Sequence, residues 1–277
     1  MNPNPILELY GIPTDTPQQD WVTLINAAKC PFLNDRCRKA RKSDSTATIG
    51  TCSVRHSQRD IVICPYRMLE QHLVFRNCIP LLQPKEGDDV HVVSEIQVTG
   101  GSVDYCLVSV RQHEIVNFIG IELQAVDTTG SLWPYRQRFL QPNDSASNLA
   151  GSFGINWKMS AKTILIQLLH KTRTFEEMNK KLVAVFQTHL FDYLRNEFQF
   201  DHLPEAESIH SLHIHVYNFQ RSSTSYTLQF HEQYGLTSEY IAKSLGLRRE
   251  GSAELDSLTR RLARKISPSN RLLFDEA

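Results

Sequence analysis

The sequence has no long hydrophobic run, no net charge and no internal repeat. No apolar stretch approaches the roughly 20 residues that a membrane-spanning helix needs, so we expect no membrane insertion. The opening "MNPNPILELYGIP" has no basic segment followed by an apolar core, which predicts no secretory signal. Thirty Lys and Arg residues balance thirty Asp and Glu residues, so the overall charge implies no wholesale electrostatic grip on nucleic acid.

What is present is the composition of an ordinary globular protein. The 277 residues are 41% hydrophobic and 22% charged, enough for one large or two smaller domains with a real core. Six cysteines without an export signal are expected to be reduced in the cytoplasm. Two basic clusters, 36–42 and 260–265, are able to contact phosphate, although solvated surface charge is the alternative for each.

The periodicity along the chain predicts a mixed α and β fold with a central mixed sheet flanked by helices. Strand-like alternation runs from about 90 to 128, a polar loop covers 141–155, and a later hairpin joins 211–220 to 225–235. Helical spacing is found at residues 17–29, 66–77, 159–174, 175–198 and 252–266. Thr237 is a plausible N-cap for a helix over 238–246. We divide the chain into an N-terminal helical and cysteine-rich region, 1–80, and a catalytic domain, 81–277.

Four of the cysteines fall within 35 residues, in the order Cys30, Cys37, Cys52 and Cys64, separated by six, fourteen and eleven residues. Four thiolates are able to surround one tetrahedral zinc or iron ion, and four sulfur ligands leave no open position for a substrate. The spacing is not that of short C-x-x-C knuckles, and small buried cysteines are the alternative. The turn residues and basic residues around them favour a structural metal.

Two candidate strands, "SVDYCLVSV" and "IVNFIGIELQAV", are joined by a short connection, "RQHE", and form a predicted antiparallel hairpin. With the turn near His113, Asp104 lies opposite Glu122, because each is nine residues from it. Period-two alternation then places Asp104, Glu122 and Gln124 on one face of the hairpin. The alternative is a surface strand with scattered polar groups.

Two carboxylates this close repel each other, and a divalent cation relieves the conflict. Their oxygen atoms suit Mg²⁺, which takes one or two carboxylates plus water and substrate phosphate. Glu95 is a possible third carboxylate. A magnesium ion held in this way activates water and stabilises a phosphodiester transition state, so the pattern favours a nuclease. The glycines of "GGS" at 100–102 allow a close backbone approach to a ligand.

A wider pattern resembles a known family. An Asp, seventeen residues and then Glu122-Leu123-Gln124 resembles the core of the PD-(D/E)XK nucleases, in which a lysine usually stands at the last position. The segments "CPFLNDRCRKARK", "GTCSV", "ICPYR", "GGSVDY", "FIGIELQAVDTTGS" and "GINWKMSAKTILIQLLHK" together resemble NotI-type type II restriction endonucleases over roughly residues 28 to 175.

The resemblance implies a prokaryotic, Mg²⁺-dependent homodimer that cuts both strands of duplex DNA at a GC-rich palindrome. It implies structural iron on Cys30, Cys37, Cys52 and Cys64. It implies magnesium on Asp104 and Glu122, with Glu95 and Gln124 completing the catalytic set. A cognate DNA methyltransferase is expected to act on the same site.

Gln124 is the departure with the largest physical consequence. Glutamine orients a water or a phosphate oxygen but adds no fixed positive charge. Lys158 and Lys162, at the start of the next predicted helix, are the candidate replacements, with exposed lysines at an ordinary helix start as the alternative. The neutral glutamine keeps two other functions open: a non-catalytic DNA-binding module with a degenerate nuclease core, and a repair or methylation-dependent nuclease.

The histidines of "HSLHIHV" form a further cluster. His213 and His215 occupy one face of a predicted strand, with His210 nearby. Because no third type of metal ligand stands at a fixed spacing, half-exposed strand histidines are the favoured interpretation.

Overall fold

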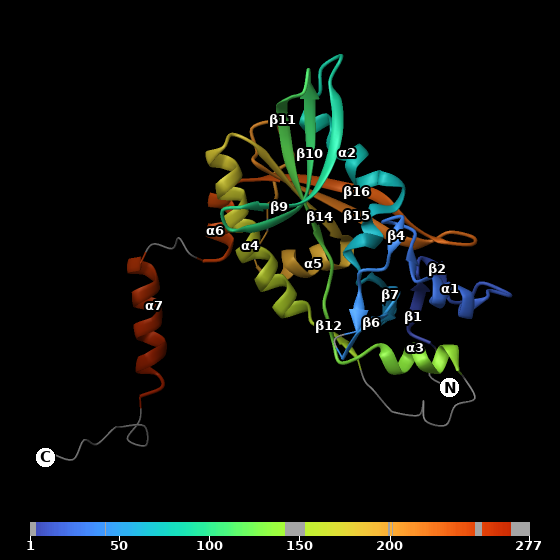
Figure 1. The fold of residues 1–277 in the computed structure, drawn as a ribbon. Coiled ribbons are helices and arrows are strands. Elements are labelled where there is room, and N and C mark those ends of the chain that lie inside the picture. Colours follow the sequence, from blue (N-terminus) through green and yellow to red (C-terminus); the bar gives the residue numbers. More distant parts are fainter. Residues whose placement is uncertain are drawn as a thin grey trace, which may run out of the picture.

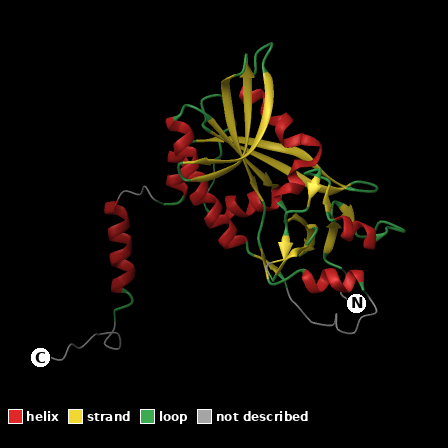
Figure 2. Ribbon diagram, in the orientation of Figure 1, coloured by secondary structure: helices red, strands yellow, loops and turns green. Residues whose placement is uncertain are grey.

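The computed structural model describes residues 4–41, 43–141, 153–198, 200, 202–246 and 251–266. A six-stranded mixed sheet forms its centre, with helices against it (Figures 1 and 2). This confirms the mixed α and β class. The strands lie in the order β16-β15-β14-β11-β10-β9. Their bounds are β9 (Asp89–Val98), β10 (Gly101–Arg111), β11 (Glu114–Gln124), β14 (Lys181–Gln187), β15 (Leu212–Arg221) and β16 (Tyr226–Leu236).

The strand directions explain why the sheet is mixed. Strands β9, β10 and β11 form an antiparallel meander with short turns. Strand β11 then pairs in parallel with β14, and β14 in parallel with β15, so the chain must cross over between them. The β15–β16 hairpin closes the other edge as an antiparallel pair, which confirms the hairpin predicted from the sequence.

Helices cover both faces of the sheet. On one face, α4 (Trp157–Glu177), α5 (Thr188–Glu197) and α6 (Ser238–Ser244) enclose a hydrophobic cluster with alternate residues of β10, β14 and β15. On the other face, the 3-10 helix η1 (Pro65–His72) and α2 (Leu73–Leu82) enclose a second cluster. Thr237 caps α6 as predicted, because its side chain accepts a hydrogen bond from the backbone N–H of Tyr240.

The N-terminal part is built largely from short strands. A four-stranded sheet has the order β2-β1-β7-β8, with β1 (Ile6–Leu9), β2 (Ile12–Pro13), β7 (Thr51–His56) and β8 (Arg59–Val62). Two small hairpins pair β3 (Lys29–Cys30) with β4 (Asp35–Arg36), and β5 (Ala40–Arg41) with β6 (Asp44–Thr48). The remaining elements are α1 (Trp21–Ala27), β12 (Thr128–Thr129), α3 (Trp133–Leu140), β13 (Gly154–Ile155) and α7 (Gly251–Ala263). Both large hydrophobic clusters include residues from this part of the chain, so it shares its interior with the central sheet.

The largest correction concerns the helix predicted over 175–198. Helix α4 ends at Glu177, and a central strand and then α5 take up the rest of the segment. The residues "KLVAVFQ" form the buried parallel strand β14, covered on both faces. Such a strand has a nearly continuous apolar run, which the sequence alone does not separate from a buried helix. Most of the predicted polar loop, 141–155, lies outside the described residues.

A buried ion pair joins distant parts of the chain. Arg67 of η1 lies between the rings of Phe32 and Phe219, and its Nε contacts the carboxylate of Glu8 at 3.0 Å. Arg67 Nη2 donates to the carbonyl oxygen of Tyr226 at 2.6 Å. A buried guanidinium is tolerated only when such partners satisfy it. Strand β1, helix η1 and the β15–β16 hairpin are therefore held together at one point.

Among the described residues, none of the helices combines the length and the apolar character that crossing a membrane requires.

Candidate active site

The predicted carboxylate hairpin is present in the structure. Tyr105 pairs with Ile121, and the ladder continues to Arg111 opposite Glu114. Gln112 and His113 form the turn with φ values of 50° and 67°, the left-handed conformation that two-residue hairpin turns require. Asp104 and Glu122 are the next residues beyond the Tyr105–Ile121 pair, so they lie across from each other on adjacent strands.

Asp104 is anchored to the neighbouring strand through its side chain. Its Oδ2 accepts a hydrogen bond of 2.8 Å from the backbone N–H of Leu123, the residue between Glu122 and Gln124. Burial raises the pKa of Asp104, while the Leu123 hydrogen bond and the charge of Lys171 act in the opposite direction. The carboxylate is thus fixed in position next to β11.

Glu122 is buried, and its carboxyl group has the most strongly shifted pKa of the site. Burial raises its pKa to about 7, and the negative charge of Asp104 adds to the rise. Lys171 of α4 partly offsets this rise in pKa, because its Nζ lies 2.6 Å from Glu122 Oε1. Because Ile121 and Leu123 pack against the η1–α2 side, Glu122 and Gln124 point to the face that α4 covers. The two carboxylates and one ammonium therefore meet between the hairpin and α4.

Gln124 and Glu95 occupy different settings. Gln124 is buried at the end of β11, two residues beyond Glu122 on the same face. Glu95 lies on β9 between residues that pair with Val103 and Tyr105, and has a φ of 58° at this interruption of the ladder. Its carboxylate is exposed and 3.2 Å from Arg38 Nη1. Through Arg38, the described part of the basic segment, 36–41, contacts strand β9 beside the carboxylate hairpin.

Lys171 is the residue that the sequence interpretation missed. The candidates Lys158 and Lys162 are exposed at the start of α4, whereas Lys171 is buried near its end. The sequence does contain a signal for its burial. One stripe of the helix has the spacing of core residues and consists of Ile164, Leu168, Lys171 and Phe175. A lysine in such a stripe requires a buried acidic partner.

The described residues contain no group of three or more His, Cys, Asp and Glu side chains arranged to hold a metal ion. For magnesium the chemistry nevertheless fits, because two carboxylates whose pKa values are raised mainly by burial, with the charge of Asp104 adding to the rise at Glu122, supply oxygen ligands and a need for positive charge. Water and phosphate commonly provide the remaining ligands of Mg²⁺. Asp104 and Glu122 are the residues that would hold the ion.

Of the four cysteines, Cys30 lies on β3 and Cys52 on β7, Cys37 follows β4, and Cys64 precedes η1. Cys30, Cys52 and Cys64 are buried, and Cys37 is partly exposed. Burial raises the pKa of the three buried thiols, and neighbouring cysteine sulfurs add to each rise. The sulfur atoms therefore lie near enough to influence one another, but their placement does not form a ligand set for one ion.

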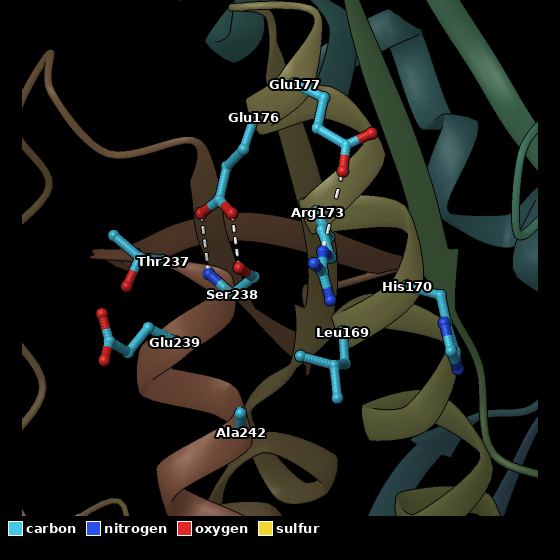
Figure 3. Close-up of a pocket in the computed structure, with 9 residues that line it drawn as sticks. All are labelled: Leu169, His170, Arg173, Glu176, Glu177, Thr237, Ser238, Glu239 and Ala242. Carbon is cyan, nitrogen blue, oxygen red and sulfur yellow. Dashed lines mark hydrogen bonds and ion pairs between the residues drawn. The ribbon is translucent and has the colours of Figure 1, made fainter. Parts of the chain in front are cut away.

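A separate cavity of about 580 Å³ lies between α4 and α6 (Figure 3). Among its charged side chains, Arg173 Nε is 3.6 Å from Glu177, and Glu176 accepts a hydrogen bond from the backbone N–H of Ser238 at 2.7 Å. None of the predicted site residues lines it. This cavity is therefore distinct from the carboxylate site.

The prediction of half-exposed histidines on β15 is wrong. His213 and His215 are both buried on the side of the sheet that packs against α2. His215 Nδ1 lies 3.9 Å from the Cys78 sulfur, and burial lowers the pKa of both histidines to about 4. Strands β14 and β16 pair with the two edges of β15, and its residues pack into hydrophobic clusters on both faces of the sheet.

Comparison with known proteins identifies the family of this chain. The sequence model of the restriction endonuclease NotI family matches residues 24–228, which include the cysteine segment, the carboxylate hairpin and α4. Among curated proteins, none shows a significant match to the sequence. The matched region covers well over half of the chain, so the protein belongs to the NotI restriction endonuclease family and is a site-specific DNA-cleaving enzyme.

Proposed function

We propose that the protein is a type II restriction endonuclease that hydrolyses phosphodiester bonds in both strands of DNA with magnesium bound at Asp104 and Glu122. Membership of the family implies double-stranded DNA as the substrate. The observation that carries the magnesium proposal is the pair of carboxylates on adjacent strands, buried enough that the pKa of Glu122 rises to about 7. A divalent cation supplies the charge that makes such a pair stable in its ionised form.

The protein groups have separable tasks in this reaction. When bound, Mg²⁺ lowers the pKa of a coordinated water and neutralises charge on the phosphate. Asp104 is held still by the Leu123 N–H, so its free oxygen is oriented without further ordering. Glu122 is fixed on one side by Lys171. Gln124 supplies amide donors and an acceptor, which orient a water or a phosphate oxygen.

Glu95 and Arg38 extend the site toward the N-terminal segment. Glu95 is a third carboxylate at the edge of the site, and its charge contributes to the raised pKa of Asp104. Its partner Arg38 is half-exposed, a suitable position for a phosphate contact. In the proposed complex the basic segment 36–42 follows the DNA backbone next to the cleaved bond.

Cutting both strands of a duplex calls for two active sites related by symmetry. We therefore propose a homodimer whose two-fold axis coincides with that of a palindromic, GC-rich target. A cognate methyltransferase that modifies the same target would protect the DNA of the host cell.

We also propose that Cys30, Cys37, Cys52 and Cys64 hold one structural iron or zinc ion. The chemistry of four neighbouring sulfurs supports this, since thiolate ligands suit both metals. No catalytic step depends on this ion.

The test uses the full-length protein with a panel of bacterial genomic DNAs, in Mg²⁺ or in EDTA. Discrete Mg²⁺-dependent fragments support the proposal, and sequencing their ends gives the recognition site and the stagger of the cut. DNA that is retained but left uncut would instead support a non-catalytic binding module. Cleavage only of methylated DNA would identify a methylation-dependent nuclease.

Glu122→Gln is the sharper variant for the catalytic assignment. It removes the charge but keeps an acceptor for Lys171, whereas Glu122→Ala would leave a buried ammonium without its partner. Losing several kcal/mol of transition-state stabilisation corresponds to a rate loss of about 10²-fold or more. Glu114→Ala, an exposed residue at the other end of β11, is the matched control and should cut normally. Full activity in Glu122→Gln would refute the assignment.

A further inference from the structure

Lys171 occupies a place where the fold otherwise demands an apolar side chain. It lies on the buried stripe of α4, between Leu168 and Phe175, and is only 5% exposed. Burying an ammonium that is neither paired nor hydrogen-bonded costs on the order of several kcal/mol. A lysine kept at this position must therefore be compensated by specific partners.

Those partners belong to the two strands of the carboxylate hairpin. Lys171 Nζ lies 2.6 Å from Glu122 Oε1 on β11 and 2.6 Å from the carbonyl oxygen of Ser102 on β10. The glycine pair before Ser102 has positive φ values and packs closely against α4. Gly101 has a φ of +132°, and a Cβ atom there would be 3.5 Å from Lys171 Cε, while one on Gly100 would be 3.2 Å from His170 Cβ.

The position of Gln124 shows what the lysine is needed for. Gln124 stands where the pattern that this hairpin resembles has a lysine, and its amide is neutral. Lys171 approaches the same face of β11 from the covering helix, two residues away from Gln124 along the strand. Its charge also acts on Asp104. The ammonium beside the two carboxylates thus comes from helix α4 and not from strand β11.

We infer that Lys171 is the cation of this active site, a positioning residue that does from helix α4 what a lysine at position 124 would do from strand β11. The inference rests on the proposed nuclease function. Lys171 holds Oε1 of Glu122 and leaves Oε2 for the metal ion, so that the carboxylate is oriented before the ion arrives. The Ser102 carbonyl fixes the ammonium in turn, so the hairpin and α4 share one rigid arrangement.

The experiment compares three variants on a plasmid that carries the mapped cleavage site. Lys171→Met removes the charge and keeps most of the volume. Lys171→Met combined with Gln124→Lys moves the charge to the strand. Lys180→Met is the matched control, because Lys180 also contacts β11, through Asn117 Oδ1 at 2.8 Å, but at the end away from the carboxylates.

We expect Lys171→Met to lose about 10- to 100-fold in cleavage rate and a similar factor in Mn²⁺ affinity, the usual cost of removing a partner that orients a metal ligand. Mn²⁺ affinity is read from the electron paramagnetic resonance signal of free Mn²⁺, without any cleavage. The double variant should regain at least about tenfold of the lost rate, because the charge is again beside Glu122. Lys180→Met should match the wild-type protein in both measurements.

Stability and DNA retention separate a role in the reaction from a role in folding. Each variant is melted thermally and tested for retention of the same plasmid fragment in EDTA. A folded, DNA-binding Lys171→Met protein that cuts at the wild-type rate, or a double variant with no recovery, overturns the inference while the proposed function stands. Should Lys171→Met alone fail to fold, the double variant with Gln124→Lys decides, because it keeps Glu122. If it folds and retains Mn²⁺ affinity within about tenfold of the wild-type protein, the inference is supported, and if it folds but binds no Mn²⁺, the inference is overturned. A wild-type protein that binds but never cuts DNA overturns both proposals.

Discussion

The buried histidines of β15 predict how the stability of the protein depends on pH. The pKa of His215 is lowered from 6.5 to about 4, first by burial and then by the charge of His213. Between pH 6.5 and 4 the unfolded chain binds a proton at this residue and the folded protein does not. The free energy of unfolding therefore falls as the pH is lowered through this window.

The size of the effect follows from the shift. One pKa unit is worth about 1.36 kcal/mol, so at pH 5 protonation of His215 in the unfolded chain costs the folded protein about 2 kcal/mol. The cost is about 3 kcal/mol at pH 4, where the folded histidine is itself half protonated. Glu122 acts with the opposite sign, because its raised pKa lets the folded protein hold an extra proton between pH 4.5 and about 7. A single pH profile of the wild-type protein would therefore mix opposing contributions.

His215→Leu isolates the histidine, because all other titrations are shared with the wild-type protein. The surroundings of the ring are the Cys78 sulfur, His213 and the edge-on ring of Phe230, so a leucine finds mainly apolar contacts. Relative to the wild-type protein, the variant should gain about 2 kcal/mol between pH 8 and pH 5. Urea unfolding followed by circular dichroism measures this difference at each pH.

A matched surface variant supplies the baseline. His231→Gln changes an exposed histidine of the adjacent strand β16 and should show no comparable gain. If the difference in unfolding free energy between His215→Leu and the wild-type protein is the same at pH 8 and pH 5, the buried neutral histidine is not the cause of acid sensitivity and the reasoning fails.

Two further predictions concern packing and metal content. A Cβ atom on Gly120 would lie 2.5 Å from Phe175 Cζ and 2.9 Å from Leu182 Cδ1. Gly120→Ala should therefore destabilise the protein by about 1–3 kcal/mol in urea unfolding and, by displacing α4, lower the cleavage rate. An unfolding free energy within about 0.5 kcal/mol of the wild-type value would contradict this. Purified protein should contain about one equivalent of iron or zinc per chain, lost on substitution of Cys52 by serine, and less than about half an equivalent by elemental analysis would rule out the four-cysteine site.

The sequence was sufficient for the local parts of the active site. The carboxylate hairpin depends on period-two alternation and on a two-residue turn at Gln112 and His113, both of which are local properties. The register of Asp104 and Glu122 then follows from counting residues. The same locality explains why the β15–β16 hairpin and the Thr237 cap were predicted correctly.

The parts that the sequence did not predict depend on tertiary contacts. Whether "KLVAVFQ" is helix or strand is decided by a parallel neighbour, β11, more than 50 positions earlier in the chain. The burial of His213 and His215 depends on the helix that covers them. The Lys171–Glu122 pair joins residues 49 positions apart, and only the packing of α4 across the sheet brings them together.

The Arg67 ion pair has a consequence for the order in which the chain folds during synthesis. Glu8 and Arg67 leave the ribosome early, but the carbonyl group that accepts from Arg67 Nη2 belongs to Tyr226, 159 residues later. Until that hairpin arrives, burying the guanidinium leaves its Nη2 without the carbonyl partner, which is unfavourable. Contacts over such a sequence separation also form late, since a long loop must close first. We therefore expect the buried arrangement around Arg67 to be completed only after the β15–β16 hairpin has been synthesised.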